Sequence, residues 1–249
     1  MSNDLMWRTA SRVHDWTDRA FLARLLAQAV ALGIIDRVDW ISNAVGGERR
    51  SLPVKARGSL PERLLGTVRT NARPGYLEAG GDGDRPWRLH LLLPRMDRSG
   101  LRLDGMSVAA LQFDGQPFDS PAGSARLSEA FTGMHTPSDT EYAGLHWQTD
   151  WQRLKSTTYR NAVTYDPMFS GVVWANFLGP CHIDQFDANS LRGLPQQCCH
   201  WLGDQGLFFM AEAALNEVRN PVAEQELARQ TEVFRAARVR SINPGVPAS

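Results

Sequence analysis

The pattern of apolar and polar residues near the N-terminus changes from strand-like to helix-like. Residues 5–9, LMWRT, predict a short opening strand. From Asp15 onward apolar residues recur at helical spacing until Gly33, which predicts a largely buried helix that ends at the glycine. Residues 46–58 are polar and predict a loop. The stretch 59–68 then opens with SLPE, the order of a capping box, and predicts a short helix.

The middle of the chain shows mostly strand patterns. A turn at 79–86 precedes WRLHLLLP at 87–94, which predicts a strand, and MSVAALQFDG at 106–115 predicts its neighbour. SARLSEAF at 124–131 predicts a modest helix. Residues 137–167 mix aromatic and polar residues without a clear period, so we expect a loop with one or two strands.

Near the C-terminus the pattern indicates strands, a hairpin and a final helix. GVVWANFLG at 171–179 is β-branched and aromatic between glycines and predicts a strand, and residues 183–194 predict a short helix. Residues 198–213 place apolar runs on both sides of GDQG, which predicts a hairpin. Asn220 followed by Pro221 predicts the cap and first residue of a helix.

Helices near both ends around hairpin-linked strands indicate an α+β fold with a mostly antiparallel sheet. The length suits a single domain over 1–249 with a substantial core. A division into sub-modules 1–115 and 116–243 stays open. We expect a flexible tail over 244–249.

The net charge is zero, but its distribution is uneven. Residues 1–110 contain 17 basic and 12 acidic residues, whereas 111–200 contain 5 basic and 9 acidic ones. This argues against a nucleic-acid-binding protein, which carries a basic surplus. It is compatible with an acidic face that meets a basic partner, and equally with solvated faces that meet none. Because the apolar stretch 20–35 is too short to span a bilayer, we expect no membrane contact. The N-terminal residues carry charges where a signal peptide needs an apolar run, and three cysteines cannot all pair in disulfides, so we expect a reducing, cytoplasmic compartment.

All three cysteines and two histidines fall near the C-terminal strand patterns: Cys181, His182, Cys198, Cys199 and His200. Zinc sites usually separate paired ligands by two or more residues, whereas these are adjacent. In a strand only Cys198 and His200 could share an ion. We therefore favour packing and predict no metal and no cofactor. A thiol- or zinc-dependent enzyme centred on Cys181, Cys198 and His200 is the alternative.

No nucleophile elbow, phosphate-binding loop, dinucleotide fingerprint or zinc-protease motif occurs in the sequence. We therefore predict no catalytic residue. The stretch DTEYAGLHWQTDW at 139–151 instead combines aromatic and acidic residues, which is typical of protein interfaces. The candidate partner-binding residues are Asp139, Glu141, Tyr142, Trp147, Asp150 and Trp151. The alternative is that these aromatic side chains face the core.

GVVWANFLGPCHIDQF at 171–186 and HWLGDQGLFFMAEA at 200–213, together with the helix at 19–33, carry a family resemblance. The chain resembles bacterial immunity proteins of contact-dependent and type VI secretion toxin systems, and most of all the immunity protein 52 family. Members of that family accompany restriction-endonuclease-like nuclease toxins. The resemblance implies a cytoplasmic, non-enzymatic protein that binds and blocks a cognate nuclease toxin. It leaves open whether the chain also forms a homodimer.

Overall fold

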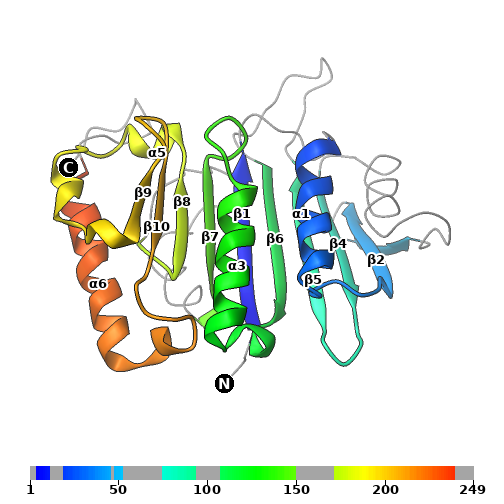
Figure 1. Cartoon of the computed structure of the whole chain (residues 1–249). Coiled ribbons are helices and arrows are strands. Elements are labelled where there is room, and N and C mark those ends of the chain that lie inside the picture. Colours follow the sequence, from blue (N-terminus) through cyan, green and yellow to red (C-terminus); the bar gives the residue numbers. More distant parts are fainter. Residues whose placement is uncertain are drawn as a thin grey trace, which may run out of the picture.

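A computed structural model describes residues 4–11, 19–45, 48–52, 75–93, 107–149 and 171–238. The described strands form one ten-stranded sheet in which every neighbouring pair is antiparallel (Figure 1). Its spatial order is β3 (Glu48–Leu52), β2 (Trp40–Val45), β4 (Gly75–Gly81), β5 (Trp87–Leu93), β6 (Ser107–Asp114), β1 (Asp4–Ser11), β7 (Tyr142–Trp147), β8 (Ala175–Leu178), β10 (Leu207–Met210) and β9 (Cys199–Trp201).

Four α-helices accompany the sheet in the described residues: α1 (Arg19–Ala31), α3 (Pro121–Met134), α5 (Pro180–Ile183) and α6 (Pro221–Ala236). Short 3-10 helices are η1 (Gln116–Phe118), η2 (Ser190–Gly193), η3 (Gln196–Cys198) and η4 (Glu217–Arg219). The α+β class, the antiparallel sheet and the flanking helices confirm the sequence prediction. No helix among these residues has both the length and the apolar character needed to cross a membrane.

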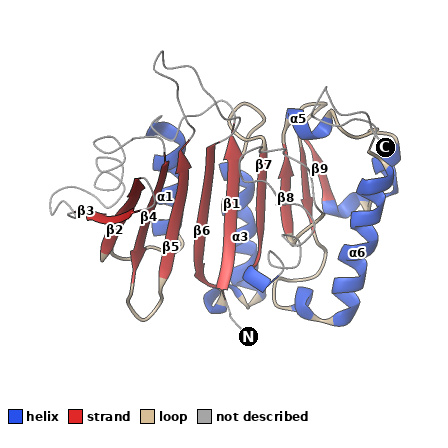
Figure 2. Cartoon of the chain, turned by 180° about the vertical axis from the view of Figure 1, so that it is seen from behind, coloured by secondary structure: helices blue, strands red, loops and turns tan. Residues whose placement is uncertain are grey.

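The helices cover opposite faces at the two ends of the sheet. Neighbouring residues of a strand point to opposite faces, and β10 shows both directions. The ring of Phe208 lies 6.3 Å from that of Phe131 on α3, whereas the ring of Phe209 lies 5.8 Å from that of Phe234 on α6. Thus α1 and α3 pack on one face (Figure 1), and α6 packs on the other face beyond β8 (Figure 2).

Helix ends follow the expected local chemistry. The Asn220 side chain accepts a hydrogen bond from the Ala223 backbone N–H at 2.9 Å, with Pro221 at the first helical position, which confirms the predicted cap. α3 begins in the same way, since Ser120 caps it and Pro121 is its first residue. It therefore starts earlier than the predicted residue 124. Gly33 ends the α1 region with a φ of +72°, a conformation that favours glycine.

The prediction of a loop over 46–58 is wrong for its first part. Residues Glu48–Leu52 form β3, which pairs with β2 from Ile41↔Leu52 to Val45↔Glu48. The polar sequence ERRSL suits an edge strand, since an edge strand has a partner on only one side. Propensity alone does not reveal this pairing. The predicted helix at 59–68 lies outside the described residues.

The strand predicted over 171–179 is shorter than expected, because Asn176 reorganises its first half. The Asn176 side chain accepts a hydrogen bond from the Val173 backbone N–H at 3.1 Å and donates one to the Val173 carbonyl at 2.8 Å. This local closure holds residues 171–174 outside the ladder, which begins at Ala175. The single helix predicted over 183–194 is also wrong, since α5 ends at Ile183 and η2 begins at Ser190.

Candidate protein-binding site

Asp139 lies in the connection between α3 and β7 and is engaged within the chain. Its carboxylate accepts a hydrogen bond from the Arg24 guanidinium on α1 at 2.6 Å. Arg24 also lies over the Phe21 ring, 5.6 Å from its centroid. The two charged side chains remain 21% and 48% exposed, so the pair ties the connection to α1 at the surface and contributes little to stability.

Glu141 and Tyr142 lie where β7 begins between its two neighbours. The Glu141 backbone N–H donates to the Ala10 carbonyl at 2.9 Å, and its carbonyl accepts from the Gly179 N–H at 2.8 Å. Glu141 is buried, whereas Tyr142 is half-buried. The Tyr142 ring lies 5.5 Å from that of His182. Both residues therefore join strands, and only Tyr142 keeps appreciable exposed surface.

Trp147 lies in the core, with 1% of its surface exposed. Its indole N–H donates to the Leu215 carbonyl at 3.1 Å, and the Arg219 guanidinium carbon lies 3.6 Å from the ring centroid. This is the core placement that the sequence left as the alternative, and it withdraws the ring from direct contact with a partner. Trp147 instead holds the segment around η4 in place. Asp150 and Trp151 lie outside the described residues.

A buried polar centre around His135, which follows α3, was not predicted from the sequence pattern. The Trp7 indole N–H donates to His135 Nε2 at 3.0 Å, so Nε2 is an acceptor and the proton resides on Nδ1. Nδ1 lies 3.2 Å from Thr140 Oγ1. Burial and then the charge of Arg24 lower the pKa of His135 to about 3. We call His135 and its aromatic neighbours Trp7, Phe21, Phe131 and Phe177 the His135 cage.

The cysteine and histidine residues do not assemble into one site in the described part of the chain. No group of three histidine, cysteine, aspartate or glutamate side chains there is close enough to hold a metal ion. Cys198 is buried and His200 is exposed. Burial is the main cause of the raised pKa of the Cys198 and Cys199 thiols, and it raises the pKa of Cys199 to about 11. A nucleophilic thiol requires the opposite shift. The Cys181 side chain lies outside the described residues.

An acidic surface that was not predicted from the sequence spans the connection from β10 to α6 and the first turns of α6. We call residues 212–226 the acidic corner. It contains one basic residue, Arg219, which packs on the Trp147 ring. It also contains Val222, which is 76% exposed, more than any other large apolar residue in the described part of the chain. Its acidic residues are Glu212, Glu217, Glu224 and Glu226. The run of glutamates beside an N-capped helix was the available sequence signal.

Comparison with known proteins shows similarity at the level of the fold. No protein-family model matches the chain, and no curated protein matches it. Among solved structures, the chain is similar to the Pseudomonas aeruginosa T6SS protein PA0821, with a TM-score of 0.54 and 14% sequence identity. The similarity covers 98% of this chain and 76% of that protein. The two proteins therefore share their architecture along nearly the whole of this chain.

Proposed function

We propose that this protein is an immunity protein that binds and neutralises a cognate secreted nuclease toxin of a type VI secretion system. The observation that carries the proposal is the fold similarity to a T6SS protein over 98% of the chain. The C-terminal sequence pattern, which resembles immunity protein 52, supports the same class. In this proposal the protein acts in the cytoplasm of the toxin-producing cell and has no catalytic role of its own.

The local charge of the acidic corner fits such a partner. A nuclease presents a cationic groove to the phosphates of DNA, and carboxylates beside an apolar contact can occupy it. The acidic corner supplies four glutamates and the exposed Val222. Burial raises the pKa of the Cys198 thiol, which does not favour Cys198 as the nucleophile of the alternative thiol enzyme.

Co-expression with the protein encoded by the neighbouring gene tests the proposal. We expect the two proteins to purify as a complex, and we expect this chain to abolish the partner's toxicity and its cleavage of DNA. A neighbouring toxin that forms no complex and remains fully toxic in the presence of this chain contradicts the proposal.

A further inference from the structure

Three side chains of α6 form a row that runs from solvent into the interior. Val222, Glu226 and Gln230 are four residues apart and so lie on one side of the helix. Exposure falls along the row, from 76% at Val222 through 44% for the Glu226 side chain to 2% at Gln230. We call these three residues the α6 row. It begins in the acidic corner and ends beside the core.

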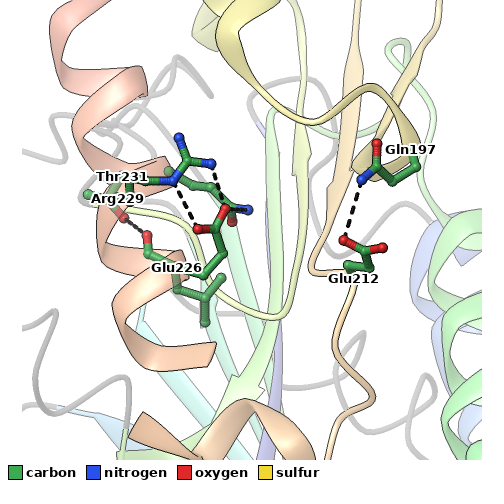
Figure 3. A network of polar contacts seen from close by, with 7 residues as sticks. Gln197, Glu212, Glu226, Arg229 and Thr231 are labelled. Carbon is green, nitrogen blue, oxygen red and sulfur yellow. Dashed lines mark hydrogen bonds and ion pairs between the residues drawn. The ribbon is translucent and has the colours of Figure 1, made fainter. Parts of the chain in front are cut away.

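A second polar pair joins the segments before and after the β9–β10 hairpin. Gln197 donates a hydrogen bond to the Glu212 carboxylate at 3.3 Å, and Figure 3 shows this pair across from Glu226. Burial is the largest cause of the raised pKa of Cys198, and the charges of Glu212 and Glu226 add to it. The charges of both carboxylates therefore act on the same thiol, and Figure 3 shows Glu212 and Glu226 on neighbouring segments.

Glu226 already binds a guanidinium group. Arg229 donates from Nε to one carboxylate oxygen at 2.9 Å and from Nη2 to the other at 2.6 Å (Figure 3). This is the two-pronged geometry by which arginine recognises carboxylates. Because the Arg229 side chain is 56% exposed, water and other cations compete for the carboxylate, and the internal pair is easily replaced.

Gln230 provides an acceptor that the chain itself does not use. Its side-chain N–H donates to Glu226 at 2.8 Å, which fixes the amide beside that carboxylate. The amide oxygen is buried and has no hydrogen-bond partner among the described residues. A buried acceptor without a donor is unfavourable. The group that satisfies both the carboxylate and this oxygen carries a positive charge and several N–H donors.

We propose that the α6 row receives an arginine side chain from a basic protein partner. The incoming guanidinium replaces Arg229 on Glu226 and donates to the Gln230 oxygen, while its apolar stem lies against Val222. The identity of the partner rests on the proposed function, since the arginine then belongs to the cationic DNA-binding surface of the toxin. The recognition of arginine itself depends only on the geometry of α6.

A hexa-arginine peptide tests the arginine site without the toxin. We titrate it into the full chain at low salt and follow the Gln230 side-chain amide and the α6 backbone amides by NMR. We expect the shifts to concentrate on the α6 row, and Glu226→Gln to weaken binding about tenfold. Arg229→Ala should strengthen binding, because it removes the internal competitor. Glu232→Gln, whose carboxylate pairs with Arg235 on the same helix, is the matched control and should change affinity less than about twofold.

Three outcomes overturn the arginine site. The first is a set of shifts that map away from α6. The second is an affinity that neither Glu226→Gln nor Arg229→Ala changes. The third is equal binding of a hexa-lysine peptide, because lysine lacks the planar fork that the site is proposed to recognise. Thermal unfolding of each variant checks that the fold is retained.

Binding of the purified toxin separates this inference from the proposed function. We expect Glu226→Gln and Gln230→Leu each to weaken the toxin complex about tenfold or more. If the toxin binds wild type and both variants equally, the site is wrong and the immunity function stands. If no toxin binds while the peptide does, the immunity function is wrong and the arginine site stands.

Discussion

The His135 cage and the α6 row both contain buried polar atoms, but they differ in how those atoms are paired. In the cage both ring nitrogens of His135 have partners, Trp7 and Thr140, and aromatic rings enclose the imidazole. In the α6 row the Glu226 carboxylate is half-exposed and holds a surface arginine, and the Gln230 oxygen has no donor among the described residues.

The pairing of a polar group therefore indicates whether the group stabilises the fold or can bind a partner. A buried polar group whose bonds are all made within the chain fixes the packing around it and has nothing left to offer a partner. A polar group that is connected to solvent and incompletely paired gains interactions when a partner arrives. The first kind should therefore affect stability and not binding, and the second kind should do the reverse.

The largest stability effect should come from the wall of the cage. Phe131 is fully buried and contacts Trp7, His135 and Phe208. Phe131→Ala removes this packing and leaves a cavity, so we expect a loss of about 3–5 kcal/mol in the free energy of unfolding. Chemical denaturation measures it. Val222→Ala, at the exposed end of the α6 row, is the control and should change stability by about 0.5 kcal/mol or less. A similar loss in both variants would erase the distinction.

The cage should also make the protein sensitive to acid. Because burial lowers the pKa of His135 to about 3, the folded state stays unprotonated between pH 6.5 and 5 while the unfolded histidine takes up a proton. Stability is therefore lost as pH falls through this window, by about 2 kcal/mol between pH 7 and 5 for this histidine. His146, whose pKa burial lowers to about 4, adds a loss of the same sign.

Unfolding curves at pH 7, 6 and 5 measure this dependence, and two variants assign it. His135→Leu should be less stable at pH 7, since Trp7 and Thr140 lose their partner, but its stability should fall less steeply with acid. His200→Gln replaces an exposed histidine and should keep the wild-type slope. A slope that His135→Leu leaves unchanged would show that the cage does not control the acid response.

A smaller effect should come from the cap that starts α6. Asn220→Ala removes the acceptor for the Ala223 N–H and should cost about 1 kcal/mol. Since α6 carries the row, the same variant should weaken arginine-peptide binding by misplacing its first turn. Ser120→Ala removes the equivalent cap from α3 and should cost a similar amount without any change in peptide binding. Equal binding losses in both variants would point to a general loss of fold.

Much of the fold followed from local patterns, and the exceptions have physical reasons. The opening strand, the helix that ends at Gly33, the C-terminal hairpin and the helix capped by Asn220 were all predicted from periodicity and capping residues. The strand ERRSL was missed because its pairing with β2 is a tertiary interaction. The late start of β8, at Ala175, was missed because the Asn176 side chain binds the backbone of Val173.

The candidate site could be predicted less well than the fold from the sequence. Trp147 belongs to an aromatic and acidic stretch, yet strand pairing turns its ring into the core and leaves it supporting Arg219 and Leu215. Nothing in the residues around 147 distinguishes this from an exposed anchor. Periodicity alone places Val222, Glu226 and Gln230 on one side of a helix. Their different exposures, which indicate a binding site, are known only from the structure.

The smallest stability effect should come from Glu226. The hydrogen bonds from Arg229 lower the pKa of this carboxyl, so its contribution is present at neutral pH and is lost as acid protonates it. The pair is exposed, however, and solvent screening leaves Glu226→Gln with an expected change of about 0.5 kcal/mol or less in the free energy of unfolding. Calorimetry at pH 7 measures this against the loss of arginine-peptide binding in the same variant. A variant that loses binding while its stability is preserved marks a surface used for recognition, whereas a comparable loss of stability would make Glu226 a structural residue like those of the His135 cage.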